Sequence, residues 1–404
     1  MCRASCRLHW ENRRAGVGRH MSEPRHAVLT VACTGSNLGG PSRTVPKLAE
    51  ELAKMGTAVT LVTLDLGKRV GHPIAPGPPV TTVFASGLYW PRARVVWSPG
   101  FARTLRDVCN VSKPHVLHDN GLWMQSNRDA ASVARELAIP LVLSPRGMLS
   151  AWALKYKSVK KRLAWVLYQR RCLSIVSAFH ATSAAEAADI RACGLEQPIA
   201  VIPNAVALPP LWTGQRTKTI LFMSRLNPNK GALELVDAWA RARVVGWKLL
   251  VVGPDENGYA NRLRESVIKQ GLSNDVVIRD AVGDIEKWDL YGAASVFILP
   301  SHSENFGVVI AEALASGTPV ITTDATPWRA VESEGCGWCV APTVSALALA
   351  MESAMTTDPV TLAAMGTLGR KLIEREFVWE RVGQQMSELY AWLTKGGRPP
   401  AFVC

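Results

Sequence analysis

The sequence lacks the features that mark membrane-spanning and secreted proteins. Its 404 residues contain no uninterrupted apolar run of about 18, the length that marks a candidate spanning helix. The first 20 residues carry five arginines but no apolar segment, so they do not form a secretory signal. They predict a basic, disordered extension over residues 1–24, with Met21 as an alternative start.

Cysteine is scarce, and the common metal and dinucleotide motifs are absent. The nine Cys are odd in number and scattered, which favours a reducing cytoplasm over a disulfide framework. Cys336 and Cys339 have the spacing of a redox pair or half a zinc site. No second pair or flanking histidine accompanies them, so we expect a structural role. Without Asp-x-Asp or G-x-G-x-x-G motifs, neither a metal site nor a resident cofactor is predicted.

Acidic residues are few in the N-terminal half of the chain. Residues 1–210 contain 27 Lys+Arg and 12 Asp+Glu, a net charge of +15. Residues 211–404 contain 19 and 21, a net charge of −2, and the two halves sum to +13. A basic half predicts an anionic partner, which leaves open a membrane surface, nucleic acid or a phosphorylated substrate.

The sequence does contain a regular alternation of apolar strands and amphipathic helices. Residues 27–33 predict a buried strand, followed by a loop that ends at Gly39 and Gly40, a helix, and a strand over residues 58–64. The same βαβ pattern fills two long stretches of the chain. It predicts an α/β protein with two doubly wound Rossmann-like domains, with ligands at the carboxyl ends of the strands and between the domains.

A proline-containing stretch over residues 203–218 separates the two series of strands and sets the domain boundary. The last apolar-periodic run predicts a helix that packs back toward the N-terminal domain. The expected parts are an N-terminal domain over residues 25–205, a C-terminal domain over residues 206–378, and a C-terminal helix and tail over residues 379–404.

Residues 299–321 carry the clearest chemical pattern. A strand over residues 296–299 precedes a loop and a helix over residues 307–316, so Glu304 lies before the helix and Glu312 inside it. Backbone amides at the helix N-terminus favour a bound phosphate, and two carboxylates beside a phosphate favour recognition of sugar hydroxyls. On spacing alone, an ordinary strand–loop–helix with one solvated and one capping glutamate remains the alternative.

Two basic residues follow the first strand of the same half of the chain. Arg225 and Lys230 lie in residues 224–231, the segment that follows the strand over residues 219–223. Arginine can bind a diphosphate through two parallel hydrogen bonds, lysine adds a point charge, and a phosphate leaving group needs both to offset its developing charge. Alone, the pair also fits a solvated basic loop. With Glu304 and Glu312, a site for a diphosphate and a sugar is favoured.

Residues 219–231 and 299–321 resemble the retaining glycosyltransferases of family 4, which have the GT-B fold. The resemblance rests on the two glutamates with seven residues between them, on Arg225 and Lys230 upstream, and on Ile202-Pro203-Asn204-Ala205-Val206 at the interdomain hinge. It extends from about residue 27 to about residue 394. It implies a nucleotide-diphosphate sugar as the donor, either a UDP-sugar or a GDP-sugar, and no cofactor.

The resemblance also implies a role for each matching position. Arg225 and Lys230 hold the donor diphosphate, Glu312 binds the ribose hydroxyls, and Glu304 contacts the transferred sugar. Because they act on the leaving diphosphate and the sugar, Arg225, Lys230 and Glu304 are also the catalytic candidates. The other implied donor-binding positions are Asn305, Phe306, Gly307 and Val308, the base-contacting loop with Val282 and Asp284, and the glycine turn Gly39–Gly40.

Polar residues also follow two strands of the N-terminal half. His118 lies in the segment HDNGLW and Arg146 in the segment SPRGML, both placed where the strands would meet the cleft. A structural histidine is the alternative for His118. Similar segments in bacterial polysaccharide glycosyltransferases imply that His118 contacts the sugar or the acceptor, as a catalytic residue, and that Arg146 is a second acceptor contact. Asp119 is assigned no catalytic role.

The family's chemistry implies a mechanism without a metal ion. No carboxylate is placed as a nucleophile, so we expect a front-face transfer that retains the anomeric configuration. The leaving diphosphate would then help to deprotonate the acceptor.

Residues 151–171 combine an apolar arc with many cations and no acidic residue. The pattern is typical of an interfacial helix on anionic lipid, with a helix packed on the sheet as the alternative. The apolar arc is Trp152, Tyr156, Val159, Leu163, Val166 and Leu167. The cations are Lys155, Lys157, Lys160, Lys161, Arg162, Arg170 and Arg171.

Taken together, these features predict a hexosyltransferase. It transfers a sugar from a nucleotide-diphosphate donor to a saccharide acceptor, lipid-linked, in bacterial surface polysaccharide biosynthesis. We expect it in the cytoplasm, peripheral on the inner face of the plasma membrane. The alternatives are a sugar-nucleotide epimerase on the same fold and a basic nucleic-acid-binding protein. The second is disfavoured because no nucleic-acid module is recognisable.

Overall fold

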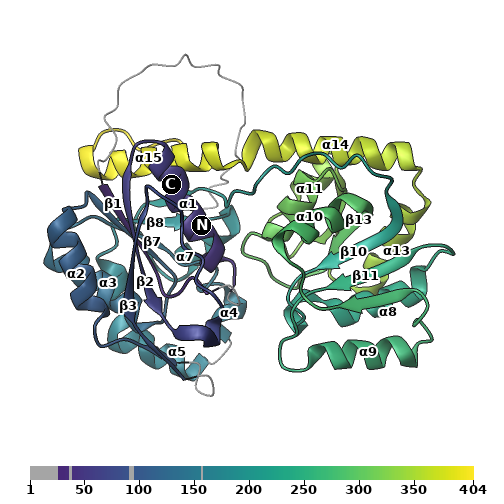
Figure 1. The fold of residues 1–404 in the computed structure, drawn as a ribbon, viewed down its shortest axis with the longest axis horizontal. Helices are drawn as coiled ribbons and strands as arrows, with labels where there is room; N and C mark the ends of the chain where they lie inside the picture. The colour runs from purple at the N-terminus through teal and green to yellow at the C-terminus, as the bar shows by residue number, and fades with distance from the viewer. Residues whose placement is uncertain (1–25, 36–38, 91–94, 156–157) are drawn as a thin grey trace, which may run out of the picture.

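The computed structural model describes residues 26–35, 39–90, 95–155 and 158–404, which form two domains lying side by side (Figure 1). Each domain is a parallel sheet with helices on both faces. The chain crosses between the two domains twice. The predicted α/β architecture with two Rossmann-like domains is confirmed.

The N-terminal domain is built on a seven-stranded parallel sheet. Its central strands are rich in buried apolar residues because helices cover both faces of the sheet. In sheet order they are β3 Thr81–Ser86, β2 Ala58–Asp65, β1 His26–Val31, β6 Val116–Asn120, β7 Leu141–Ser144, β8 Ala178–Ala181 and β9 Ile199–Val201. A small antiparallel hairpin, β4 Leu88–Trp90 with β5 Val95–Trp97, follows the edge strand and was not predicted.

The C-terminal domain is built on a six-stranded parallel sheet. In sheet order its strands are β12 Val276–Arg279, β11 Lys248–Val252, β10 Thr217–Met223, β13 Ala294–Leu299, β14 Val320–Thr323 and β15 Gly337–Val340. The strand order reverses beside β10 here and beside β1 in the other sheet. At such a reversal the connections leave on opposite faces, so a crevice opens at the carboxyl ends of the strands.

Helices connect the strands in both domains. Those of the N-terminal domain include α1 Pro41–Lys54, α2 Phe101–Ser112, α3 Gln125–Glu136 and α7 Ala184–Ala192. Those of the C-terminal domain are α8 Ala232–Ala242, α9 Tyr259–Lys269, α10 Asp284–Ala293, α11 Val308–Ala315, α12 Ala330–Ser333, α13 Val344–Thr356 and α14 Pro359–Glu376. The predicted C-terminal helix is α15, Trp379–Lys395.

The C-terminal helix α15 packs on the N-terminal domain, although the chain reaches it from the C-terminal domain (Figure 1). Val382, Met386, Leu389 and Tyr390 join one of the two N-terminal cores. A β-carbon at Gly383 would lie 2.9 Å from Glu51 Cγ on α1, so glycine allows this close packing. The predicted packing of the last helix on the first domain is therefore confirmed.

The two crossings between the domains are paired with each other. The amide of Val206 donates to the carbonyl of Phe377 at 2.9 Å, and Val206 forms a parallel bridge with Val378. We call residues 202–206 the hinge, as in the sequence pattern.

The segment over residues 151–171 is helical where the structure describes it, and it contains a π-helical turn. It forms α4 Ala151–Lys155, α5 Ser158–Ala164, a π-helical turn η2 Trp165–Gln169 and α6 Arg170–Ser174. Leu163, Val166 and Leu167 are 61%, 78% and 64% exposed, so this part of the predicted apolar arc does not pack on the sheet. Tyr156 and Lys157 lie outside the described residues, and so do the side chains of Val159 and Lys160.

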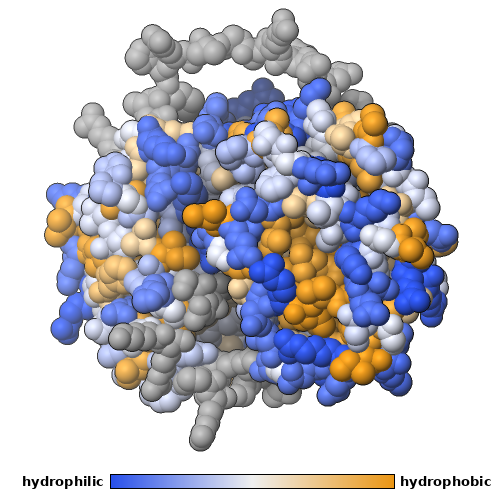
Figure 2. All heavy atoms as spheres, turned by 45° about the vertical axis from the view of Figure 1, so that its right-hand side comes forward, coloured by the Kyte–Doolittle hydropathy of each residue, from blue (hydrophilic) through white to orange (hydrophobic). Residues whose placement is uncertain are grey.

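The surface is mostly hydrophilic with separate apolar patches on the face shown in Figure 2. Among the described residues, no helix has both the length and the apolar character needed to cross a bilayer.

Candidate active site

Lys230 and Glu304 form an ion pair at the carboxyl edge of the C-terminal sheet. Lys230 ends a short 3-10 helix after β10, and Glu304 lies in the loop after β13. Nζ of Lys230 contacts Oε1 of Glu304, and both side chains are only 11% exposed. The hydroxyl of Ser301 donates to the same carboxylate oxygen at 3.0 Å. The structure therefore brings together two of the predicted catalytic residues.

A glycine makes this pairing possible. Gly231 has φ of 68°, and a β-carbon there would lie 2.3 Å from the carbonyl oxygen of Pro300. Only a residue without a β-carbon lets the loop after β10 pass so close to the end of β13.

The predicted helix start after Glu304 is present. We call residues 304–307 the donor loop, after the role that the family resemblance implies for them. It ends at Gly307, which has φ of 80° and precedes α11. The indole nitrogen of Trp328 donates to the carbonyl of Phe306, and the two rings lie 5.3 Å apart. The loop is thereby fixed with the N-terminus of α11 at its end, where free amides favour an anion.

Glu312 is held by two partners on α10. Nζ of Lys287 lies 2.8 Å from Oε1 of Glu312, and the hydroxyl of Tyr291 donates to Oε2 at 3.1 Å. The Glu312 side chain is 14% exposed. Burial, together with the nearby Glu312 carboxylate, raises the pKa of Tyr291 well above its ordinary value, so Tyr291 stays a hydrogen-bond donor.

Arg225 does not contact the Lys230–Glu304 pair. Its guanidinium makes an ion pair of 2.7 Å with Glu256, and Asn227 donates to the other oxygen of that carboxylate at 2.8 Å. The Arg225 side chain is 52% exposed, so it can reorient at small cost. Its role toward a diphosphate stays a prediction.

The predicted base-contacting loop and the glycine turn approach each other across the domain boundary. Arg43, in the first turn of α1 after Gly39 and Gly40, binds Asp284 through Nη1 at 2.8 and 3.1 Å. Val282 is half-buried against the C-terminal core. This surface ion pair links the two domains at one side of the site.

His118 is not at the end of a strand and does not face the domain boundary, which corrects its predicted role. It lies inside β6, its side chain is fully buried, and both ring nitrogens have protein partners. Nδ1 lies 2.6 Å from the hydroxyl of Tyr390, and Nε2 lies 2.7 Å from the hydroxyl of Ser144. A side chain so enclosed has no surface with which to contact a sugar.

The hydrogen bonds of His118 belong to a chain with one direction. The carbonyl of Ile202 only accepts, so Nε2 of His180 carries the proton and donates to it at 2.8 Å. Nδ1 of His180 then accepts from Ser144 at 2.7 Å, Ser144 accepts from His118, and His118 accepts from Tyr390. Burial lowers the pKa of His118 and lowers that of His180 to about 3, so both rings are neutral. The chain connects α15 to the hinge.

Arg146 connects the end of β6 to the hinge through hydrogen bonds. It donates to the side-chain oxygen of Asn120 through Nε at 3.2 Å and Nη2 at 2.7 Å, and to Asn204 through Nη1 at 2.8 Å. Burial lowers its pKa to about 10. Three of its five N–H groups are therefore bound within the protein, and its contact with an acceptor stays a prediction.

Several residues in and around the candidate site were not predicted from the sequence. They include Thr182, which follows β8 and contacts Asn305 of the donor loop, and Glu186 in the first turn of α7, which binds Thr182. The pattern Ser183-Ala-Ala-Glu186, a capping box, was the available signal for Glu186. Lys287 and Tyr291 had no signal, because only the tertiary fold brings them to Glu312.

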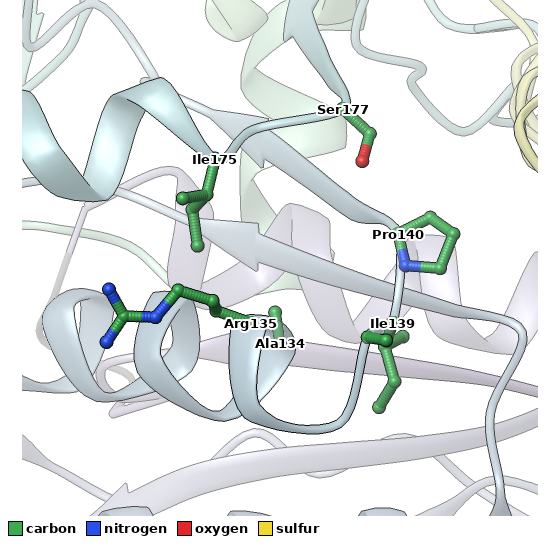
Figure 3. A pocket seen from close by; sticks show the side chains of 7 residues that line it. Ala134, Arg135, Ile139, Pro140, Ile175 and Ser177 are labelled. Atoms are coloured by element: carbon green, nitrogen blue, oxygen red, sulfur yellow. The ribbon is translucent and has the colours of Figure 1, made fainter.

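A cavity of about 310 Å³ lies at the opposite, amino-terminal edge of the first sheet (Figure 3). The hydroxyl of Ser177 in its wall already accepts from the amide of Leu141 at 3.2 Å. The lining is Ala134, Arg135, Ala138, Ile139, Pro140, Ile175 and Ser177. None of the predicted site residues lines it, so we place the candidate active site at the domain boundary instead.

The facing Rossmann-like domains and the paired loops at their carboxyl edges are those of the GT-B class of glycosyltransferases. Residues 39–205 match the model of the glycosyl transferase 4-like domain, and residues 213–371 match that of the glycosyl transferases group 1. Together the matches cover more than half of the chain, which belongs to the glycosyltransferases that carry both domains.

Individual relatives are more distant. A D-inositol 3-phosphate glycosyltransferase of Streptomyces bingchenggensis is 30% identical over 190 residues, which span 44% of this chain and 41% of that protein. Sucrose-phosphate synthase from Thermosynechococcus elongatus superposes with a TM-score of 0.73 at 22% identity, covering 92% of this chain and all of the other. Anabaena HepE, solved in complex with UDP-glucose, superposes with a TM-score of 0.69 at 19% identity, covering 90% and 98%. These two structures support the fold alone.

Proposed function

We propose that the protein transfers a sugar from a nucleotide-diphosphate sugar to a saccharide acceptor, with retention of the anomeric configuration. The observation that carries the proposal is the Lys230–Glu304 pair beside the N-terminus of α11, with Glu312 one helix turn and more beyond. The pair places a cation for the leaving diphosphate next to a carboxylate for the sugar hydroxyls. UDP is the first donor nucleotide to test, because HepE was solved with UDP-glucose.

The chemistry we propose needs no metal ion. The charge that develops on the leaving diphosphate is offset by Nζ of Lys230 and by the backbone amides of residues 305–308. Glu304 accepts from the hydroxyls of the transferred sugar while Lys230 and Ser301 keep its carboxylate oriented. The acceptor oxygen bonds to the anomeric carbon on the face from which the diphosphate leaves, so the configuration is kept. The released diphosphate oxygen takes the acceptor proton.

We further propose that the acceptor is lipid-linked and that the enzyme works at the inner face of the plasma membrane, in bacterial surface polysaccharide biosynthesis. Support comes from the exposed apolar side chains of α4, α5 and η2, with Trp152 at 54% and Val166 at 78% exposed. Lys155 on α4, Arg162 on α5, and Arg170 and Arg171 on α6 are also exposed. Apolar side chains flanked by cations match the needs of an anionic lipid surface.

A donor screen tests the proposal. Purified protein is incubated with UDP-, GDP- and ADP-sugars and a lipid-linked saccharide, and the release of nucleotide diphosphate is followed. We expect turnover with one base, and NMR of the product should show a retained anomeric linkage. An inverted linkage would refute retention, and thermal stabilisation by oligonucleotides with none by nucleotide diphosphates would favour the nucleic-acid-binding alternative.

A further inference from the structure

A hydrogen bond between side chains crosses the domain boundary at the donor loop. Nδ2 of Asn305 donates to Oγ1 of Thr182 at 2.7 Å. Thr182 directly follows β8 of the N-terminal domain, and its side chain is buried. Asn305 is the neighbour of Glu304 in the sequence. The N-terminal domain therefore contacts the donor loop one residue away from the Lys230–Glu304 pair.

The side chain of Asn305 contacts two loops of the N-terminal domain. Besides Thr182 it lies against Gly147, where a β-carbon would be 2.9 Å from Cβ and 3.1 Å from Cγ of Asn305. Gly147 has φ of 76°, so both its backbone conformation and its neighbour require glycine. Together, Thr182 and Gly147 form a notch that fits the Asn305 side chain.

One buried carboxylate holds both walls of this notch. Oε1 of Glu186 accepts from the amide of Gly147 at 2.6 Å, and Oε2 accepts from the amide and the hydroxyl of Thr182 at 2.7 and 2.9 Å. Glu186 is only 2% exposed and lies in the first turn of α7. The Thr182 hydroxyl donates its hydrogen bond to Glu186. Its oxygen is therefore left to accept the hydrogen bond from Asn305.

We propose that Glu186 is a positioning residue for sugar transfer: by fixing Thr182 and Gly147 it seats Asn305, and so sets the geometry of the donor loop when the two domains meet. Bond making requires the donor and the acceptor to be held within a fraction of an ångström. The notch links the loop that holds the donor to the domain that faces it. This inference rests on the proposed function, and it assigns Glu186 a role that acts through Thr182 and Gly147.

Thr182 is the residue to test first because valine keeps its shape and removes its hydroxyl. In Thr182→Val we expect kcat to fall by on the order of ten- to a hundredfold, while the dissociation constant of the nucleotide diphosphate changes less than about twofold. Thr182→Ser keeps the hydroxyl and should retain most of the activity. Glu186→Gln should lower kcat as well, because its amide would face a backbone N–H, whereas the exposed Glu196→Gln serves as its control.

A double-mutant cycle isolates the contact itself. If Asn305 and Thr182 act through their hydrogen bond, Asn305→Ala combined with Thr182→Val should lower kcat no further than the worse single variant. Additive losses would overturn the proposal, and so would full activity in Thr182→Val.

Hydrogen exchange gives a readout that does not depend on turnover. Amides of the donor loop should exchange faster in Thr182→Val and Glu186→Gln than in the wild type and in Thr182→Ser. Unchanged exchange in both variants would overturn the role of the notch. Failure of the proposed function is recognised separately, because the wild type itself would then bind no nucleotide diphosphate and release none from any donor.

Discussion

The hydroxyl of Tyr390, on the last helix, donates to Nδ1 of His118, in the middle of the first sheet, at 2.6 Å. These residues are 272 positions apart. Both are fully buried, and the bond starts the chain that ends at the carbonyl of Ile202 in the hinge. His118 therefore holds the C-terminal helix and the hinge on the N-terminal domain.

This arrangement predicts a loss of stability in Tyr390→Phe. The variant keeps the packing of the ring but leaves Nδ1 of His118 buried without a donor, which typically costs about 1–3 kcal/mol. Urea unfolding with a fluorescence readout measures the change. The matched control is Tyr89→Phe, because the half-buried Tyr89 hydroxyl has no hydrogen-bond partner among the described residues; it should change stability by less than about 0.5 kcal/mol. Equal stabilities of wild type and Tyr390→Phe would contradict the assigned bond.

Asp119 should make stability depend on pH. Burial raises its pKa to about 7, although Thr30 at 2.6 Å and Asn127 at 2.9 Å donate to its two oxygens. Between the ordinary pKa near 4 and about 7, the folded protein holds a proton that the unfolded chain has released. Raising the pH through this window therefore lowers the contribution of Asp119 to stability.

Asp119→Asn removes this contribution to the pH dependence. The Asn amide can donate to the Thr30 hydroxyl while its oxygen accepts from Asn127, so the fold should persist. Urea unfolding at several pH values across the window should show a shallower decline in the variant than in the wild type. Parallel curves for the two proteins would show that Asp119 does not titrate there.

Loss of Lys230 or Glu304 should abolish most sugar transfer. Lys230→Met and Glu304→Gln each remove one charged group from the site, and stabilisation of transition-state charge by one group typically carries ~3–4 kcal/mol, or roughly 10²–10³ in kcat. Steady-state release of nucleotide diphosphate measures the loss. Lys269→Met, an exposed lysine on α9, is the control and should keep full activity.

Each single variant of this pair also leaves a nearly buried charge without its partner, so stability must be measured in parallel. The combined variant Lys230→Met, Glu304→Gln removes both charges and should be more stable than Lys230→Met alone. If any of these folded variants turns over like the wild type, the pair is not part of the site.

Glu312→Gln should weaken donor binding more than it slows the chemical step. Lys287 and Tyr291 orient the carboxylate, and its remaining lone pairs are suited to ribose hydroxyls. Losing a charged acceptor for hydroxyls typically costs about 1.5–3 kcal/mol, or on the order of 10- to 100-fold in the dissociation constant of the nucleotide. Calorimetry with nucleotide diphosphate checks this, with the exposed Glu286→Gln on α10 as the control. Unchanged affinity would remove Glu312 from the ribose site.

Charges placed on the exposed apolar side chains should weaken membrane binding. Val166→Asp and Leu167→Asp change residues that are 78% and 64% exposed, so the fold should tolerate them. Each substitution makes the free energy of transfer to lipid less favourable by on the order of 1–2 kcal/mol. The two substitutions together should lower binding to anionic vesicles by more than tenfold. The control is Val245→Asp, which is 98% exposed in the C-terminal domain. Co-sedimentation that is equal in all three would show that this surface does not meet lipid.

The sequence by itself determined the alternation of strands and helices, because a parallel sheet covered on both faces needs continuous apolar runs. The strand predicted over residues 58–64 is β2, Ala58–Asp65, and α11 begins one residue after the predicted Gly307. Glu304 and Lys230 were predictable because the carboxyl ends of neighbouring parallel strands meet at one edge of the sheet. The small strand β15 and the hairpin β4–β5 were not, since short runs carry little periodicity.

Tertiary structure alone decided which polar residues meet and which are enclosed. His118 follows an apolar run in the sequence as a ligand residue would, and only the packing of α15 places Tyr390 against it. The apolar arc of α5 and η2 has the periodicity of a buried face, yet the fold leaves Val166 exposed. Periodicity shows that one face of a helix is apolar, but contacts between residues far apart in the chain decide what covers it.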